Sequence, residues 1–263
     1  MTDSAAPILV DRQGHVAHLV LNRPHKLNAL DLPALSDLHA ALDALEADPG
    51  VRVVVARGEG RAFCTGLDLG MTSDALTDSH AIDRVVSVAH RTFARLEASP
   101  LPIVAAIHGM ALAGGLEFVL ACDLALAATN ARLGDFHARY GLFPGGGASQ
   151  RLPRVIGERR AKWLLLSGEW VTGSVAADWG LVNEAVEPDR LVERADELAQ
   201  LLARRSPLLS SVIKQTVRVG AKMDLPTALE AERPLFLRYM ASEHARIGLD
   251  AFAARTEPVF PDR

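Results

Sequence analysis

The chain contains little cysteine and few aromatic residues. Two of its 263 residues are cysteine, and phenylalanine, tryptophan and tyrosine together contribute 5%. Cys64 and Cys122 lie in apolar sequence and lack the spacing of a metal site, so we expect two buried free thiols in a reducing compartment. The N-terminus is acidic and has neither a basic segment nor a long apolar core, which is unlike a secretory signal. We therefore expect a cytoplasmic enzyme.

Positive charge is not concentrated anywhere in the sequence. The formal net charge is −4 and no dense block of Lys and Arg occurs, so we expect a small soluble partner rather than nucleic acid or a membrane. No HExxH or paired-cysteine pattern is present, so no metal is expected. The glycines at 145–147 are not followed by the Lys-Ser/Thr of a phosphate loop, and Ser149 is not followed by the x-Gly of a nucleophile elbow.

The longest apolar stretch, residues 103–128, is interrupted by polar groups. A membrane span would bury His108, Glu117 and Asp123, and a central Asp alone costs about 2.5–3.5 kcal/mol in a bilayer. From Gly114 onward the residues are apolar on every helical face, which predicts a buried helix. Glu117 would have a raised pKa there and exchange protons near neutral pH, or it is a structural carboxylate held by a buried partner.

Small residues stand at the predicted start of this helix. Ala113, Gly114 and Gly115 leave room for an approach to the backbone N–H groups, which stabilise negative charge at a helix start. The loop FCTGLDL follows a predicted strand, and Gly66 permits a conformation that points the Leu67 N–H outward. The N–H groups of Leu67 and Gly114 would then form a pair of donors for a developing oxyanion. Either glycine alone is also typical of a simple turn.

Strand-like runs alternate with helical patterns, which predicts an α/β fold. The length fits one large domain or one domain with a helical appendage. We expect a hairpin of strands at 8–10 and 16–21, a helix capped by Asp31, and further strands at 51–56, 103–107 and 124–128. Helices are expected at 81–98, from Ala148, at 159–166 and 175–180, and then at 191–219, 227–240 and 243–254.

Several motifs occur in order along nearly the whole chain. They are NRPHKLNAL, FCTGLDL, HGMALAGGLEFVLACD, YGLFPGGGASQRLPRVIG and SGEWVTGSVAADWGLVNEAV. Together they resemble the successive signatures of the enoyl-CoA hydratase/isomerase (crotonase) superfamily. The resemblance implies a crotonase-like spiral of ββα units over residues 1–195 and a helical trimerisation region over 196–263. It also implies an acyl-CoA thioester substrate, with coenzyme A as part of the substrate and no separate cofactor, and a homotrimer or homohexamer.

The resemblance also assigns catalytic roles. The thioester oxygen would lie between the N–H groups of Leu67 and Gly114, Glu117 would handle the transferred proton, and the reaction would be addition of water to a 2-enoyl thioester. Family hydratases carry a second Glu at the position of His137. An imidazole has an ordinary pKa near 6.5, so His137 could act as acid, base or water-holder, or it could be a pocket-lining side chain bonded to the backbone. Asp135 could orient His137 or serve as a loop residue.

Further positions match family contacts to coenzyme A. Gly70 stands where relatives often have Lys, and Arg255 replaces a common Lys but still suits phosphate. Open alternatives are another family reaction, namely double-bond isomerisation, decarboxylation or thioester hydrolysis, and a catalytically idle acyl-CoA binding protein. The expected coenzyme A contacts are Lys26, Ala29, Thr65 and Leu67 from one subunit and Phe236, Phe252 and Arg255 from its neighbour.

Overall fold

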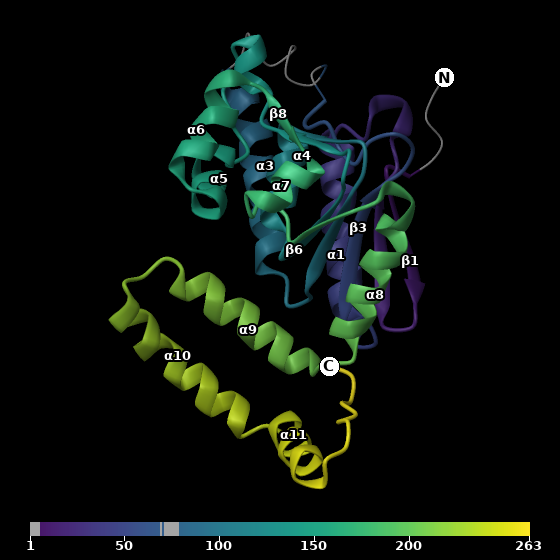
Figure 1. The fold of residues 1–263 in the computed structure, drawn as a ribbon, viewed down its shortest axis with the longest axis vertical. Helices are drawn as coiled ribbons and strands as arrows, with labels where there is room; N and C mark the ends of the chain where they lie inside the picture. Colours follow the sequence, from purple (N-terminus) through teal and green to yellow (C-terminus); the bar gives the residue numbers. More distant parts are fainter. Residues whose placement is uncertain (1–5, 69, 71–78) are drawn as a thin grey trace.

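A computed structural model describes residues 6–68, 70 and 79–263, and its centre is a six-stranded sheet (Figure 1). β1 (Ile8–Gln13) and β2 (Val16–Leu21) form the antiparallel hairpin that the sequence predicts. The sheet continues with β3 (Val53–Gly58), β4 (Ile103–Ile107), β6 (Leu124–Ala128) and β9 (Glu184–Val186), each parallel to its neighbour. Every residue of β2 and β4 is buried, as expected for strands covered on both faces.

Helices packed on this sheet supply the rest of the core. α1 (Leu32–Ala47) begins after Asp31, whose carboxylate accepts the Ala34 N–H at 2.9 Å, so the predicted cap is confirmed. α3 (Ser79–Ala98) lies beside α1, and α8 (Leu191–Ala203) packs on β3 and β4. The remaining helices of the body are α4 (Gly114–Ala121), α5 (Ala148–Ile156), α6 (Glu158–Ser167) and α7 (Gly173–Asp178).

A second, three-stranded sheet holds the segments on either side of α4. It contains β5 (Met110–Leu112), β7 (Arg132–Gly134) and β8 (Trp170–Thr172), in that order. Short 3-10 helices lie at η1 (Pro24–Lys26), η2 (His137–Tyr140) and η3 (Pro188–Arg190). Because β7 ends at Gly134 and η2 begins at His137, the second sheet fixes the position of the segment that carries His137.

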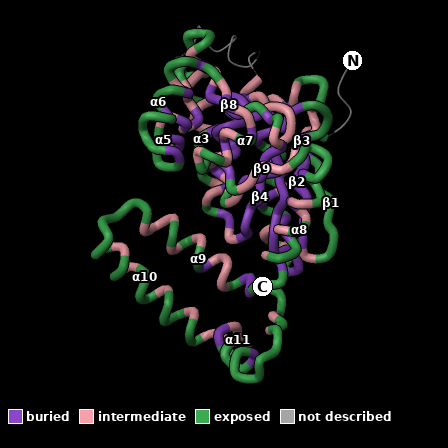
Figure 2. The backbone as a smooth tube through the Cα atoms, in the orientation of Figure 1, coloured by how far each residue is buried: buried purple, intermediate pink, exposed green. Residues whose placement is uncertain are grey.

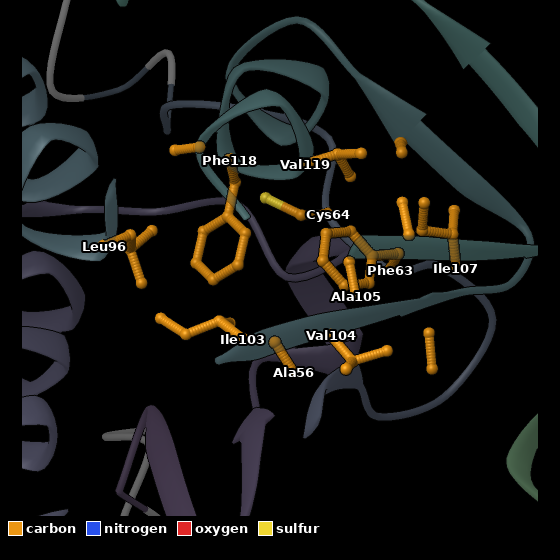
Figure 3. Packing of buried hydrophobic residues seen from close by; sticks show 14 of the residues in the cluster. Ala56, Phe63, Cys64, Leu96, Ile103, Val104, Ala105, Ile107, Phe118 and Val119 are labelled. Carbon is orange, nitrogen blue, oxygen red and sulfur yellow. The ribbon is translucent and has the colours of Figure 1, made fainter. Parts of the chain in front are cut away.

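Figure 3 shows the apolar cluster that supports the first turn of α4 and the loop after β3. Phe63 and Phe118 meet edge to face, with ring centroids 5.6 Å apart, and Phe118 makes a similar contact with Phe93 at 6.4 Å. These rings are fully buried beside Ile103, Val104 and Ala105 of β4. Close packing of this kind leaves little freedom to the backbone on either side.

The C-terminal region from Pro207 onward forms an arm of three helices below the body (Figure 1). They are α9 (Pro207–Gly220), α10 (Leu225–Met240) and α11 (Glu243–Ala254). The single helix expected at 191–219 is wrong, because α8 ends at Ala203 and α9 starts at Pro207, with Ser206 accepting the Leu209 N–H at 3.0 Å. Proline cannot continue a helix but suits its first turn. The expected division at 195 and 196 falls inside α8.

The arm leaves the body and the chain then returns to it. Arg52 donates to Asp262 at 2.9 Å, to the Phe260 carbonyl at 2.9 Å and to the Ala203 carbonyl at 3.2 Å. Arg263 caps the end of α1 by donating to the carbonyls of Leu45, Glu46 and Asp48. Between these anchors α10 has no buried residue, and Figure 2 shows the arm mostly exposed.

The described part of the chain has no helix that is long and apolar enough to cross a membrane. The apolar stretch at 103–128 is divided among β4, β5, α4 and β6, so its length reflects several short buried elements.

Candidate active site

Glu117 lies in the first turn of α4 and is 1% exposed. Its Oε1 accepts the backbone N–H of Ala148 at 2.9 Å. Burial raises the pKa of the Glu117 carboxyl, while the Ala148 hydrogen bond and the charge of His137 oppose that rise. The expected buried carboxylate with a raised pKa is therefore present, and it has a partner that the sequence did not suggest.

The glycine run before α5 closes over Glu117. A Cβ on Gly146 would lie 2.1 Å from Glu117 Oε2 and 2.8 Å from the Phe93 ring, so a side chain does not fit there. Gly147 has a φ of 111°, and α5 begins directly after it at Ala148. The glycines thus let the backbone of this segment pack against the Glu117 carboxylate. This role does not involve a phosphate, in agreement with the missing phosphate-loop signature.

His137 begins η2 and lies close enough to Glu117 for each charge to shift the other's pKa. Its Nδ1 is 3.1 Å from Asp135 Oδ1, and the same oxygen accepts the His137 N–H at 3.3 Å. Burial lowers the pKa of His137, but the hydrogen bond and charge of Asp135 and the charge of Glu117 outweigh this effect and raise it overall. The structure therefore brings the two predicted acid/base residues together and adds Asp135 to them.

The two predicted oxyanion donors come from glycines in direct contact. A Cβ on Gly66 would lie 2.8 Å from the Gly114 nitrogen, and a Cβ on Gly114 would lie 3.2 Å from the Leu67 nitrogen. Gly66 has a φ of 106°, which turns the chain sharply before Leu67. Among the described residues, neither the Leu67 N–H nor the Gly114 N–H has a backbone acceptor. Two donors therefore converge beside the first turn that carries Glu117.

Gly115 serves a different purpose from the one its size suggested. A Cβ there would lie 2.0 Å from the Cys64 carbonyl oxygen, so the loop after β3 itself occupies the space next to Gly115. The Leu112 N–H donates to that carbonyl at 3.0 Å. We expected Ala113, Gly114 and Gly115 to leave space for a bound molecule. At Gly115 this expectation is wrong, because the backbone of the chain itself fills the space.

The expected coenzyme A contacts of the N-terminal half meet at one edge of this site. Thr65 Oγ1 donates to the Leu27 carbonyl at 3.3 Å, and the Leu30 N–H donates to the Gly66 carbonyl at 2.7 Å. These bonds join the segment with Lys26 and Ala29 to the loop with Thr65 and Leu67. Lys26 is exposed and Ala29 is half-buried.

The expected contacts of the C-terminal region lie elsewhere in the single chain. Phe236 on α10 and Phe252 on α11 are 56% and 85% exposed, and Arg255 follows α11. In Figure 1 these helices lie away from α4. One chain therefore does not bring them to Glu117.

Asn28 is a site-building residue that the sequence analysis missed. It is buried, and its Nδ2 donates to the Ala62 carbonyl at 2.7 Å and to the Glu59 carbonyl at 2.9 Å. Its Oδ1 accepts the Arg23 N–H at 2.8 Å, and its φ of 57° is one that Asn tolerates better than most residues. Asn28 thereby ties the segment with Lys26 and Ala29 to the end of β3. The available signal was a single polar residue, Asn28, between the apolar Leu27 and Ala29.

The two thiols are unsuited to nucleophilic chemistry. Both are free, and burial raises the pKa of Cys64 to about 12 and raises that of Cys122 as well. In the described residues, no three His, Cys, Asp or Glu side chains come together as a metal site would require.

A separate groove of about 650 Å³ lies at the carboxyl ends of β3, β4 and β6. Its charged lining includes Arg57, Arg61 and Arg132, with Glu59 among them. Glu117, His137, Leu67 and Gly114 are not part of its lining. The chemistry-bearing residues are therefore concentrated at α4 and not in this groove.

The site therefore consists of two backbone N–H donors close to a buried carboxylate whose pKa is raised. A family model described as enoyl-CoA hydratase/isomerase matches residues 11–263. The chain belongs to this family, and the expected resemblance is confirmed.

Two relatives and one solved structure illustrate the similarity. The 2,3-dehydroadipyl-CoA hydratase of Escherichia coli (strain K12) is 36% identical over 256 residues, covering 97% of this chain and 99% of the relative. The short-chain-enoyl-CoA hydratase of Clostridium acetobutylicum is 32% identical over 246 residues, covering 93% and 94%. The crystal structure of an enoyl-CoA hydratase from Bacillus anthracis matches with a TM-score of 0.91 at 34% identity, covering 97% and 98%. The predicted crotonase-like α/β fold is confirmed by this match.

Proposed function

We propose that the protein is an enoyl-CoA hydratase-like enzyme that adds water to a 2-enoyl-CoA thioester, or removes it in the reverse direction. The observation that carries the proposal is the close approach of Gly66 and Gly114, which brings the backbone nitrogens of Leu67 and Gly114 near each other at the start of the helix that carries Glu117. Water addition at C3 places negative charge on the thioester oxygen, and preorganised donors stabilise that charge. Relatives named hydratases at 32–36% identity support the same reaction.

Glu117 and His137 would share the proton transfers. Water has to lose one proton as its oxygen bonds to C3, and C2 of the enolate has to gain one, so the site needs one group that accepts and one that donates. Burial raises the pKa of Glu117, and Asp135 with Glu117 raises that of His137, so both pKa values move toward the range in which a side chain can do either. The protons then balance within the pair over one turnover.

Coenzyme A would lie along the edge formed by Lys26, Ala29, Thr65 and Leu67. The phosphate and adenine end would reach Phe236, Phe252 and Arg255 of a neighbouring subunit in a homotrimer or homohexamer. Two observations support this assembly: the arm exposes apolar side chains, and those three residues lie away from Glu117 in the single chain. The free thiols suit a reducing, cytoplasmic location.

The test is hydration of crotonyl-CoA, followed by loss of the conjugated thioester absorbance. Glu117→Gln keeps the shape of the side chain and removes its basicity, so turnover should fall by roughly two to four orders of magnitude while acyl-CoA binding is retained. Glu158→Gln, on the exposed surface of α6, is the matched control and should keep full turnover. Full turnover in Glu117→Gln would refute the role of Glu117, and binding without turnover in the wild type would identify an idle acyl-CoA binding protein.

Thioester hydrolysis is the second candidate, because the Asp135–His137 pair is suited to activating water. Hydrolysis would release free coenzyme A thiol, whereas hydration leaves the thioester intact. A thiol reagent added to the same crotonyl-CoA assay separates the two reactions. Thiol release at the rate of absorbance loss would favour hydrolysis over hydration.

A further inference from the structure

We propose that Asp135 is a positioning residue that fixes the ring of His137 with Nδ1 toward Asp135 and Nε2 available for proton transfer. The inference rests on the proposed function for its kinetic consequence, since His137 is given its role there. Its structural part stands on the geometry around η2. The family resemblance left open whether His137 takes part in the chemistry or merely lines the pocket. The contact between Asp135 and the His137 ring favours a part in the chemistry.

The hydrogen bond determines the tautomer. A carboxylate oxygen accepts but does not donate, so the 3.1 Å contact between Asp135 Oδ1 and His137 Nδ1 requires the proton to reside on Nδ1. In the neutral ring, Nε2 is then the nitrogen with the lone pair. Asp135 is fully buried directly after β7, whereas 17% of the His137 side chain is exposed. The partner is thus rigid and the imidazole remains accessible.

The backbone between the two residues is held in an uncommon conformation. Phe136 has a φ of 67°, a left-handed conformation that is strained for a bulky residue. Its ring is held by Tyr140, at 5.9 Å between centroids, and by the guanidinium of Arg139, at 5.2 Å from the ring centroid. This turn lets one Asp135 oxygen meet both the backbone N–H and the ring of His137.

A purely structural turn would not require this carboxylate. Asp135 Oδ2 is buried and has no hydrogen-bond partner among the described residues, which is costly for an ionised group. An amide or hydroxyl could cap the His137 N–H without that cost. A charged ring at Nδ1 offsets the burial of the carboxylate, so the arrangement favours a cationic His137.

The two charges that act on His137 have the same effect on its pKa. Asp135 and Glu117 favour the protonated ring, and on the side of α6 Arg139 pairs with Glu169 at 4.0 Å. When Nε2 accepts a proton from water, Asp135 would stabilise the resulting imidazolium without moving. This is the logic by which a buried Asp supports a His base in hydrolytic triads.

The first experiment needs no substrate. In ¹⁵N-labelled protein, the His137 resonances are assigned by comparison with His137→Gln and titrated with pH. We expect the tautomer protonated at Nδ1, and we expect Asp135→Asn to lower the pKa of His137, because the hydrogen bond and charge of Asp135 favour the protonated ring. The tautomer protonated at Nε2, or an unchanged pKa in Asp135→Asn, would overturn the proposal. Failure of the hydratase assay would leave this result interpretable.

The second experiment measures crotonyl-CoA hydration across pH. Asp135→Asn should lower kcat about ten- to a hundredfold with little change in KM. It should also move the acidic limb of the profile to lower pH, because His137 with a lower pKa is already deprotonated at a lower pH. Asp123→Asn is the control, since Asp123 accepts the Ile103 N–H at 2.7 Å outside the site. The control should change stability and leave the limb in place. The same pH profile in Asp135→Asn and Asp123→Asn would show that Asp135 has only a structural role.

Discussion

At the residue scale, the surroundings of Glu117 depend on which neighbours have no side chain. Gly66 and Gly114 touch through their Cα regions, and Gly146 closes over the carboxylate, so each glycine is required by a contact. The sequence predicted Glu117 from its apolar neighbours, and it predicted the pairing of Leu67 with Gly114 from a glycine at each of two loops and from the family resemblance. It did not predict the contact between Gly146 and Glu117, which joins segments about thirty positions apart and exists only once α4 and α5 have packed.

A methyl group at Gly146 should disable the site while leaving the fold largely intact. Gly146→Ala places a Cβ where Glu117 Oε2 lies, so the carboxylate has to shift, and misplacement by about 1 Å can cost a hundredfold in rate. Gly145→Ala is the matched control, since its Cβ would lie 3.4 Å from Val86, an ordinary contact. Turnover of crotonyl-CoA and circular dichroism of both variants provide the measurement. Equal turnover in the two variants would contradict the assigned role of Gly146.

His137 should contribute stability that depends on pH with a definite sign. Its pKa is raised in the folded protein, so the folded state binds the proton more tightly than the unfolded chain, whose pKa is near 6.5. The stabilisation is fully present below about pH 6.5 and disappears as the pH rises through the folded-state value.

Urea unfolding of the wild type and His137→Gln at a series of pH values measures this contribution. The difference in free energy of unfolding should be largest at acidic pH and should shrink above pH 6.5, by about 1.4 kcal/mol for each unit of raised pKa. His90→Gln, an exposed position on α3, controls for loss of an imidazole. A difference that grows with pH would show that the imidazole is held neutral.

At the element scale, the sequence predicted elements that have caps or long periodic patterns and missed short ones. Asp31 and the leucines of α1 gave that helix its start and its buried face. β5, β7, β8 and β9 span three residues each, too few for a periodic signal, and they are strands because of long-range pairing. Ser206-Pro207 indicates a helix start and so a break between α8 and α9. The break was not predicted, because the apolar pattern continues on both sides of it.

One ion pair should link α9 to the body of the protein. Lys214 Nζ lies 2.6 Å from Asp123 Oδ2 and 2.6 Å from the Leu101 carbonyl, and its side chain is 10% exposed. Lys214→Met leaves the Asp123 carboxylate without its cation, so the free energy of unfolding should fall by about 3 kcal/mol. Adding Asp123→Asn should recover part of that loss.

Lys162→Met on α6 is the matched control for this pair. Lys162 pairs with Glu158 at 2.8 Å on the exposed surface, where solvent screening leaves such a pair with little effect on stability. Chemical denaturation of the wild type and the three variants provides the comparison. If both Lys→Met variants lose the same stability, Lys214 does not anchor the arm.

At the scale of the whole molecule, the arm is the part whose surface does not suit an isolated chain. Its exposed apolar side chains are Leu208, Ile213, Val217, Leu225, Leu229, Phe236, Leu237, Met240, Leu249 and Phe252. A surface of this extent is typical of a protein–protein contact. The family resemblance assigns Phe236, Phe252 and Arg255 to a coenzyme A site, whereas the structure of one chain places them away from Glu117. This separation is what the proposed oligomer, in which a second copy supplies these residues, would require.

If a neighbour completes each site, two inactive variants should restore activity to one another. Arg255→Glu should weaken coenzyme A binding and raise KM, while Glu117→Gln abolishes turnover. Mixed oligomers, formed by coexpression, contain some sites with Glu117 from one subunit and Arg255 from the next. With random mixing at equal amounts, about a quarter of the sites are intact, so about a quarter of the wild-type rate should return at low substrate concentration.

A chain that carries both substitutions provides the control. Suppose that each site takes Glu117 from one subunit and Arg255 from the next. A Glu117→Gln/Arg255→Glu double variant coexpressed with the wild type then also has about a quarter of its sites intact, so its rate should equal that of the mixture of the two single variants. If both residues instead served the site of their own chain, the two single variants would not complement at all, whereas the double variant with wild type would retain about half of the sites. The ratio of these two rates therefore decides whether the site spans the subunit interface.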